Sequence, residues 1–371
     1  METKQQMTAV DEQLKSPESA PLRVGDVQIL DIELAHDRKG HEYTVRRVHV
    51  EDESDANPEL RDMYNQQANI METSLRSNPQ WGKTVIADGE VNVAENNKAA
   101  QWLYYDEAGE PTQSIEWAGK FPTAIALEPL QRLESGGRWF KAGHSDERSL
   151  ELYAYMSDAI GLRSRARIYG QRLVEYAEES NVDELSIISL GSGAAVPNIQ
   201  ATKALEAEGR AVNWKFFDFD PNALMFAREL IEESDFKLSS FDYGPSWLNP
   251  ETDQVEPKGQ LYQRAFAVED ESADIVDALG LWEYLKPHEA TAFANKLFKK
   301  VKPGGSLIVS NMLPSRPHRE FNQRAVGWPN LHLRNETDLL DIVEAAEIDT
   351  SQVTMTHAED GVYVVMEIKK L

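Results

Sequence analysis

The feature that most constrains this chain is an apolar strand followed at once by a glycine turn. Residues 187–190 are Ile-Ile-Ser-Leu, and residues 191–195 are Gly-Ser-Gly-Ala-Ala. A short, nearly continuous apolar run suits a strand that is buried on both faces, as in a parallel sheet. Gly191 and Gly193 let the backbone turn sharply and leave room for a ligand, and the following helix points its free N–H groups at the same place. The pattern predicts half of a doubly wound α/β domain.

The next predicted strand, residues 213–217, ends in two acids. Asp218 and Asp220 are separated by one residue, and Pro221 follows. An acid at the end of the second strand of such a domain can accept hydrogen bonds from both ribose hydroxyls of a nucleoside. A glycine loop that serves only helix–strand packing is the alternative. The acid at the next strand end favours the nucleoside site, because this motif depends on its context.

The glycine loop lacks one residue of the dinucleotide-binding motif. That motif has a third glycine at the sixth position, where this chain has Val196, followed by Pro197. The third glycine allows the helix to approach the strand closely. The missing glycine therefore weakens the prediction of a nicotinamide cofactor.

Two more strands follow the loop at regular spacing. Residues 273–279 form an apolar run that leads into Gly-Leu-Trp-Glu-Tyr-Leu at 280–285, and residues 298–311 contain a helix end, a Pro-Gly-Gly turn and a strand. This succession resembles the class I S-adenosylmethionine-dependent methyltransferases over residues 147–371. Residues 280–285, 311–314 and 328–334 together resemble a bacterial subgroup that includes enzymes thought to methylate 3-hydroxy fatty acids.

The resemblance implies S-adenosyl-L-methionine as the cofactor and a doubly wound, Rossmann-like sheet as the fold. In that family the glycine loop lies under the methionine part of the cofactor, and the acid after the second strand holds the ribose. Two positions depart from the family pattern, since Ser189 replaces an acid and Ala195 replaces a third glycine. The implied cofactor-binding residues are Gly191, Ser192, Gly193, Ala195, Asp218, Asp220, Leu279 and Gly280.

Candidate catalytic residues follow the third and fourth strands. Glu283 and Tyr284 lie where family members place residues that face the transferred methyl group. A carboxylate acceptor would need no general base, whereas a hydroxyl or amine would use Glu283, His288 or His318. Candidate substrate-binding residues combine apolar surface with two guanidinium groups, which suits an apolar acid; they are Asn311, Arg316, Arg319 and Trp328. The alternative is that these arginines balance the excess of acids.

The first 144 residues predict a smaller α+β region. Residues 27–34 and 43–50 alternate like a strand pair, residues 57–74 have a helical pattern, and residues 102–117 suggest a second hairpin. The expected domains are a disordered tail at 1–21, an α+β lid or dimerisation region at 22–144, and the methyltransferase domain at 145–371. A homodimer is therefore an expected partner.

Residues 145–180 are predicted to be helical, with a break at Gly161. Arg163, Arg165 and Arg167 alternate in this segment. They form either a solvated arginine face or a clamp for a carboxylate, since arginine presents a planar fork to acids.

Composition excludes several classes of function. The chain has 371 residues, no cysteine and 63 acids against 38 bases, a formal net charge of −25. Without cysteine there is no disulfide framework and no cysteine nucleophile. The acidity disfavours a nucleic-acid partner. A metal site is not expected, because His288 has Ala292 rather than a second ligand four residues later. The apparent lack of a signal or membrane span predicts a cytoplasmic protein.

The sequence therefore predicts a methyltransferase that acts on a small-molecule or lipid-like acceptor, with a carboxylic or hydroxy acid as the expected class. Three alternatives stay open. They are an NAD-dependent oxidoreductase, an aminopropyl-transferring relative that would need acids near Asp277 or Asp242 to hold an amine, and a catalytically silent methyltransferase-like interaction protein.

Overall fold

The computed structural model describes residues 26–121, 123–132, 146–218, 220–233, 240–242, 265–328 and 331–371. The expected tail at 1–21 lies outside these residues. The chain divides into two compact units, and their division along the chain differs from the expected single boundary at residue 145. The first unit comprises Met1–Pro21, Asp52–Arg163 and Pro317–Asn330, and the second comprises Leu22–Glu51, Ser164–Arg316 and Leu331–Leu371.

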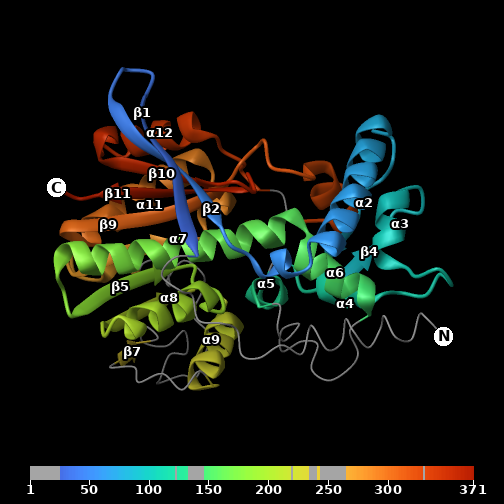
Figure 1. Ribbon diagram of the computed structural model, residues 1–371, viewed down its shortest axis with the longest axis horizontal. Helices are drawn as coiled ribbons and strands as arrows, with labels where there is room; N and C mark the ends of the chain where they lie inside the picture. The colour runs from blue at the N-terminus through green and yellow to red at the C-terminus, as the bar shows by residue number, and fades with distance from the viewer. Residues whose placement is uncertain are drawn as a thin grey trace. The chain divides into compact units, whose positions relative to one another are not determined.

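The second unit is built on a nine-stranded mixed sheet, several of whose strands are labelled in Figure 1. Its strand order is β1-β2-β10-β11-β9-β8-β5-β6-β7. The strands, in chain order, are β1 (Val27–His36), β2 (Glu42–Val50), β5 (Glu184–Leu190), β6 (Ala211–Phe217), β7 (Ser240–Asp242), β8 (Ala273–Ala278), β9 (Val301–Met312), β10 (Val353–Ala358) and β11 (Tyr363–Lys369). The four strands predicted between residues 187 and 311 are all present.

The strand order reverses in the middle of the sheet. Strands β7, β6, β5, β8 and β9 are parallel. From β5 the chain passes through α8 (Val196–Ala207) to β6 and through α9 (Pro221–Glu233) to β7, and then returns to β8 on the other side of β5. Open α/β sheets bind ligands at such a switch point, outside the carboxyl ends of the strands. The reversal between β5 and β8 therefore marks the expected place of a site.

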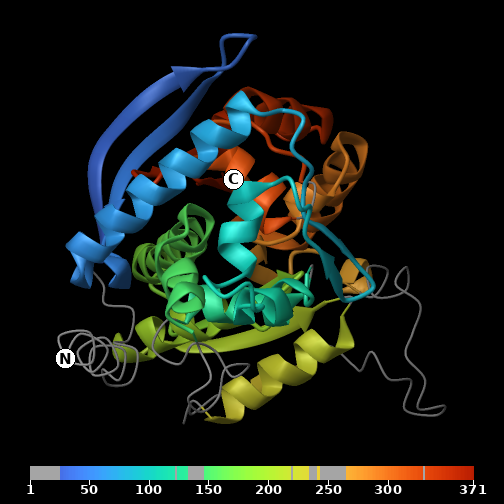
Figure 2. The same ribbon diagram turned by 90° about the vertical axis from the view of Figure 1, so that its right-hand side faces the viewer.

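Strands β1 and β2 form the predicted antiparallel pair, drawn in blue in Figure 2. The free edge of β2 pairs in parallel with β10, from Thr44 opposite Thr354 to Val48 opposite Ala358. This pairing explains why residues 27–50 belong to the second unit instead of a separate N-terminal region. A ladder with β10 satisfies backbone groups that an isolated hairpin would expose.

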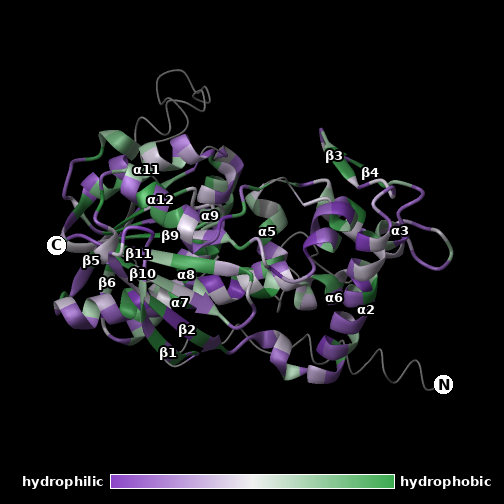
Figure 3. Ribbon diagram, turned by 90° about the horizontal axis from the view of Figure 1, so that it is seen from above, coloured by the Kyte–Doolittle hydropathy of each residue, from purple (hydrophilic) through white to green (hydrophobic). Residues whose placement is uncertain are grey.

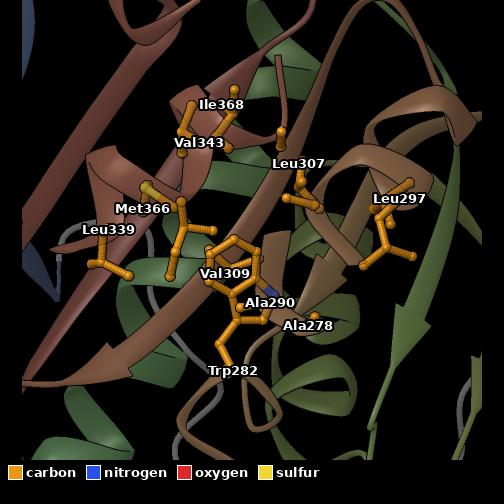
Figure 4. Close-up of a cluster of buried hydrophobic side chains, with 14 of the residues drawn as sticks. Ala278, Trp282, Ala290, Leu297, Leu307, Val309, Leu339, Val343, Met366 and Ile368 are labelled. Atoms are coloured by element: carbon orange, nitrogen blue, oxygen red, sulfur yellow. The ribbon is translucent and has the colours of Figure 1, made fainter. Parts of the chain in front are cut away.

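A hydrophobic cluster joins the sheet to α11 (Pro287–Lys300) and α12 (Glu336–Ala345) (Figure 4). Alternate residues of a strand point to the same face, so Leu307 and Val309 of β9 and Met366 of β11 meet these helices. Both helices carry hydrophilic and hydrophobic residues, as Figure 3 shows for α11. Their N-termini are fixed by acids that accept a backbone N–H three residues earlier, Glu289 in α11 and Asp338 in α12.

The first unit contains mainly helices within its described residues. Its elements are η1 (Glu53–Ala56), α2 (Pro58–Ser77), β3 (Val85–Ala87), β4 (Glu90–Asn92), α3 (Lys98–Tyr104), α4 (Gln113–Ala118), α5 (Ala124–Gln131), α6 (Glu147–Tyr155) and η5 (Phe321–Val326). The predicted helix at 57–74 is confirmed as α2. The predicted hairpin at 102–117 is wrong, because α3 and α4 flank a turn with only one bridge, between Tyr105 and Pro111. Asn97 caps α3 by accepting the Ala100 N–H (3.0 Å).

The helical prediction for residues 145–180 is confirmed, but the break lies elsewhere. The chain forms α6 and then α7 (Ser157–Ser180), so the helices separate at Met156 and Gly161 lies inside α7. A glycine inside a helix costs only about 1 kcal/mol, which the surrounding packing can offset. Across the described residues, none of the helices is both long and apolar enough to cross a membrane.

Candidate functional site

The glycine loop joins β5 to α8 in a conformation that suits glycine. Gly191 and Gly193 have φ angles of +68° and +57°. A Cβ atom added to Gly191 would lie 3.3 Å from the Cβ of Leu281. Ala195 also has a positive φ, +55°, at the start of α8, so alanine here adopts a backbone region that glycine prefers. Gly191 is therefore favoured for two reasons: its positive φ angle and the short distance between its backbone and Leu281.

Asp218 connects the end of β6 to this loop. Its Oδ2 accepts the Gly193 N–H (2.7 Å), and its Oδ1 accepts the Asp220 N–H (2.9 Å). Asp220 instead accepts the Asn222 N–H (3.0 Å) in the first turn of α9. The structure thus brings the predicted ribose acid and the glycine loop together, while Asp220 has a local role at the helix start.

The end of β8 lies beside the same loop. A Cβ added to Gly280 would lie 3.9 Å from the Gly191 carbonyl oxygen, so the two predicted cofactor residues are neighbours. The Ser192 hydroxyl is buried and has no hydrogen-bond partner in the described part of the chain. A buried hydroxyl without a partner is uncommon and indicates a place where a ligand can bind.

Asp277 of β8 places a carboxylate beside Ser189, the position at which the methyltransferase pattern has an acid and this chain has none. Its Oδ1 accepts a hydrogen bond from Ser189 (2.7 Å), the residue that replaces the family acid, and its Oδ2 accepts from Tyr169 (2.6 Å). The Asn198 side-chain amide lies 3.4 Å from the same Oδ2. Burial raises the pKa of Asp277 to about 7, although the hydrogen bonds from Tyr169 and Ser189 act in the opposite direction. Asp277 thus pairs with three side chains of the protein itself, which gives no support to it as the acid that would hold a substrate amine in the aminopropyl alternative.

Glu283 lies six residues later, in the short helix η4 (Trp282–Tyr284). Its side chain is 4% exposed, and its Oε1 lies 3.4 Å from the Tyr363 hydroxyl and 3.8 Å from Arg165 Nη1. Among the described residues, nothing hydrogen-bonds to its Oε2. Burial raises the pKa of Glu283, and Arg165 offsets part of this effect. A carboxylate with a raised pKa is suited to accepting a proton.

Arg165 of α7 is buried against the ends of β8 and β9. Its Nη1 donates to the Leu279 carbonyl (2.8 Å) and lies 3.4 Å from the Ser310 hydroxyl. Its guanidinium carbon lies 4.7 Å from the centre of the Tyr363 ring. Arg163, also buried, forms a two-pronged ion pair with Asp52 in the first unit (2.7 and 2.8 Å). The interpretation of these arginines as a solvated face is therefore wrong for both residues.

Asn311 of β9 holds a neighbouring loop. Its Nδ2 donates to the His332 carbonyl (3.0 Å), and its Oδ1 accepts from Arg334 (2.9 Å). Arg334 also donates to the Trp282 carbonyl (2.7 Å), and the His332 N–H donates to the Glu283 carbonyl (2.7 Å). Asn311 and Arg334 therefore fix the backbone around Glu283. By contrast, Tyr284 is 41% exposed.

The remaining predicted residues are distributed over both units. Arg316, in the second unit, is buried, and its Nη1 lies 2.9 Å from the Met312 sulphur. The other three belong to the first unit: His318, Arg319 and Trp328. His318 contacts Asn69 (3.2 Å), and burial lowers its pKa. A role of these four residues in substrate binding or catalysis stays a prediction.

Two further observations concern metals and His288. Within the described ranges, no three His, Asp or Glu side chains are grouped so that they could hold a metal ion. His288 lines a groove of about 820 Å³ between α11 and α12, and no residue of the glycine loop lines that groove. This location gives no support to His288 as the general base.

Sequence reasoning missed the partners that complete the site. Tyr169 and Tyr363 carry no motif, and both reach the site from segments far away in the chain. Only the alternating arginines of residues 163–167 could have indicated Arg165, and their pattern did not distinguish a buried arginine from an exposed one.

No protein-family model matches the sequence, and neither does any curated protein. Among solved structures, the chain is similar to a possible exported protein from Bordetella parapertussis, with 15% identity, a TM-score of 0.50, and coverage of 71% of this chain and 83% of that one. It is also similar to the SAM-bound magnesium protoporphyrin IX methyltransferase from Synechocystis PCC 6803, with 15% identity, a TM-score of 0.38, and coverage of 57% of this chain and 82% of that one. The similarity to the CurJ carbon methyltransferase has 12% identity, a TM-score of 0.45, and coverage of 81% of this chain and 70% of that one. At these identities the similarity concerns the fold. The strand order is that of a doubly wound, Rossmann-like α/β fold.

Proposed function

We propose that this chain is an S-adenosylmethionine-dependent methyltransferase that acts on a small-molecule or lipid-like acceptor. The observation that carries the proposal is the hydrogen bond from the Gly193 N–H to Asp218 at the switch point of the sheet. It joins the glycine loop to the acid expected to hold the ribose, beside Gly280 at the end of β8. The resemblance of residues 147–371 to class I methyltransferases supports the same cofactor.

The residues present fit this cofactor. Gly191 and Gly193 adopt the positive φ angles of a tight glycine turn, the Ser192 hydroxyl has no partner in the described residues, and Asp218 presents a carboxylate. The bound cofactor would supply a methyl group already activated on a sulfonium. The remaining cofactor-binding predictions, Ala195, Asp220, Leu279 and Gly280, lie in the same loop, at the start of α9 and after β8.

The protein's own contribution is positioning and proton transfer. An activated donor leaves the protein to orient the acceptor and exclude water. Glu283 and Arg165 are buried together beyond the ends of β8 and β9, where water is excluded from their charged groups. Glu283 would take the proton of a hydroxyl or amine acceptor. Tyr284, Asn311 and Arg316 are proposed to surround the acceptor, with an apolar carboxylic or hydroxy acid as its class. Roles of His318, Arg319 and Trp328, which belong to the first unit, stay predictions.

An NAD-dependent oxidoreductase is the main alternative enzyme. Val196 is buried at the first position of α8, where the third glycine of a dinucleotide motif would stand. A side chain there prevents the close approach that this glycine allows. The observation favours S-adenosylmethionine over NAD. The narrower relation to the 3-hydroxy fatty acid subgroup, a cytoplasmic location and a homodimer stay predictions.

Calorimetry with the purified protein tests the proposal. We expect S-adenosylhomocysteine to bind and NAD to produce no heat of binding. Gly193→Val should abolish S-adenosylhomocysteine binding, because a β-branched side chain disfavours the positive φ and fills the space of the loop. Ala195→Gly is the matched control in the same loop and should bind at least as well as the parent.

The contrary results are equally specific. Binding of NAD alone would support the oxidoreductase. Binding of neither nucleotide would support a catalytically silent interaction protein. Retained S-adenosylhomocysteine binding in the valine variant would remove the glycine loop from the site.

A further inference from the structure

Arg165 and Glu283 form a buried ion pair that is incomplete on both sides. Their side chains are 3% and 4% exposed, and Arg165 Nη1 lies 3.8 Å from Glu283 Oε1. Arg165 Nε and Glu283 Oε2 are buried, and neither has a hydrogen-bond partner in the described residues. Buried charged groups normally have all of their hydrogen-bonding atoms paired, because an unpaired one costs free energy. The pair therefore offers one free donor and one free acceptor.

The surrounding contacts hold this pair in place. The Leu279 carbonyl and the Tyr363 ring fix the Arg165 guanidinium. Glu283 is fixed by its backbone, since its carbonyl accepts the His332 N–H (2.7 Å). Leu279 directly precedes Gly280, which neighbours Gly191 of the glycine loop. A rigid donor and acceptor thus lie next to the predicted cofactor site, where an acceptor substrate would have to bind.

Arg165 Nε is a hydrogen-bond donor and Glu283 Oε2 is an acceptor, so the two atoms together favour some acceptor groups of the substrate over others. A hydroxyl can accept the Arg165 Nε–H through its oxygen and donate its own hydrogen to Glu283 Oε2. A carboxylate has no hydrogen to donate to Glu283 Oε2. A protonated amine has no lone pair with which to accept the Arg165 Nε–H. The donor–acceptor pair therefore complements an alcohol.

We propose that Arg165 and Glu283 bind an alcohol hydroxyl of the acceptor and that this hydroxyl is the methylated group. The inference rests on the proposed function and goes further in naming the acceptor atom. The hydroxyl oxygen forms a bond to the methyl carbon while the carbon–sulphur bond breaks and its electron pair stays on sulphur. The hydroxyl proton passes to Glu283 Oε2. The products are a methyl ether, S-adenosylhomocysteine and a protonated Glu283, which then returns its proton to water.

A set of matched acceptors tests which group is methylated. The probes are 3-hydroxydecanoic acid, methyl 3-hydroxydecanoate, whose hydroxyl is the free group, and decanoic acid, whose carboxylate is the free group. We expect turnover of both hydroxyl compounds, and the transferred methyl group should remain on the product after alkaline hydrolysis because it is held in an ether. Decanoic acid should not be turned over. Formation of an alkali-labile ester from decanoic acid, or no turnover of either hydroxyl compound by a protein that binds S-adenosylhomocysteine, overturns the inference.

A binding measurement tests the two residues without turnover. Calorimetry in the presence of S-adenosylhomocysteine compares methyl 3-hydroxydecanoate with methyl decanoate, which lacks the hydroxyl. We expect Arg165→Lys and Glu283→Gln each to weaken binding of the hydroxyl compound by about 10-fold, the effect of one hydrogen bond to a charged group. Neither variant should change the binding of methyl decanoate or of S-adenosylhomocysteine.

Arg172→Lys is the control for damage to a buried ion pair of the same helix. Arg172 is paired with Glu367 (2.9 Å) and belongs to no part of the proposed site. This variant should bind every probe like the parent. If Arg165→Lys and Glu283→Gln bind the hydroxyl compound as tightly as the parent, the pair does not hold the acceptor. This conclusion would apply even if S-adenosylhomocysteine binding supports the proposed methyltransferase function. If the parent does not bind S-adenosylhomocysteine, the proposed function itself fails.

Discussion

Two buried carboxylates at the carboxyl end of the sheet have opposite surroundings. Asp277 and Glu283 are 2% and 3% exposed and only six residues apart. Both oxygens of Asp277 accept hydrogen bonds, from Ser189 and Tyr169. Glu283 has a long contact to Tyr363, and its Oε2 has no partner among the described residues. Burial alone therefore does not distinguish a structural acid from a reactive one, whereas the state of each oxygen does.

The two carboxylates also differ in what their partners connect. Ser189 lies on β5 and Tyr169 on α7, so Asp277 ties neighbouring elements together beneath the glycine loop. The cation nearest to Glu283 is Arg165, whose Nε is itself without a partner in the described residues. A fully satisfied network rigidifies a fold, and a half-satisfied one is costly unless a ligand completes it. We therefore expect Asp277 to affect stability and Glu283 to affect chemistry.

Replacing each acid by its amide should produce the largest difference between the two, in the value of kcat/KM. Glu283→Gln should lower kcat/KM for 3-hydroxydecanoic acid by about 100- to 10,000-fold, the usual contribution of a general base. Asp277→Asn should change kcat/KM by less than about 10-fold, since it is expected to act only by positioning the loop. Steady-state assays of S-adenosylhomocysteine formation measure both values. Equal losses in the two variants would abolish the distinction between the acids.

The titration of Asp277 should be visible in the pH dependence of the unfolding free energy. Its pKa is raised from 3.8 to about 7 in the folded protein, so the folded state binds the proton more tightly than the unfolded state. The resulting stability is fully present below about pH 4 and is lost as the pH rises through 7. Between pH 5 and pH 8 the loss amounts to about 2–3 kcal/mol of unfolding free energy.

Asp277→Asn should remove this part of the pH dependence. Urea denaturation of the parent and the variant at pH 5 and pH 8 measures it. The parent should lose more unfolding free energy than the variant over this interval. An identical loss in both proteins would show that Asp277 does not titrate as its burial predicts.

A third acid, Asp218, extends the comparison because its Oδ2 accepts a hydrogen bond from the glycine loop. Asp218→Ala should weaken S-adenosylhomocysteine binding by about 10- to 100-fold, since a charge-assisted hydrogen bond contributes about 1.5–3 kcal/mol. Asp277→Asn should bind this ligand within about threefold of the parent. Asp218→Asn separates the effects, because it keeps an oxygen for the Gly193 N–H and loses the negative charge. Unchanged affinity in Asp218→Ala by calorimetry would exclude the ribose assignment.

Much of the fold could be predicted from local patterns. The strand ending at Leu190, the glycine turn and the acid at 218 all lie within about 30 residues, so spacing along the chain reflects proximity in space. The assignment of residues 27–50 could not be predicted in this way. Their pairing with β10 joins segments about 300 residues apart, and no local pattern encodes such a partner.

The site divides in the same manner. Gly191 and Asp218 were predictable because conformation and strand ends restrict the residue types there. The family pattern has an acid at the position of Ser189, whereas here the acid beside Ser189 belongs to β8, where Asp277 lies opposite Ser189 in the parallel pair. Arg165 lay in a segment with alternating arginines, and only tertiary packing determines that it is buried.

The smallest expected effect concerns Tyr363, the other neighbour of Glu283 Oε1. Burial raises the pKa of this carboxyl, whereas Arg165, the residue's own backbone N–H, the Tyr363 hydroxyl and Arg334 all favour its ionised form. Removing one of them should raise the pKa of Glu283, so the acidic limb of kcat/KM should move to higher pH. A hydrogen bond of 3.4 Å is at the long limit, and we expect a shift of about half a pH unit or less.

Tyr363→Phe tests this effect with little other change. Phenylalanine keeps the ring that lies 4.7 Å from the Arg165 guanidinium, so the arginine keeps its support. Asp277 should not be affected, and the unfolding free energy should therefore retain its loss between pH 5 and pH 8. The pH profile of kcat/KM for methyl 3-hydroxydecanoate measures the shift, because this probe has no carboxylate of its own to titrate. Movement of the acidic limb to lower pH would mean that the Tyr363 hydroxyl does not stabilise the ionised Glu283, and that some other group sets the limb.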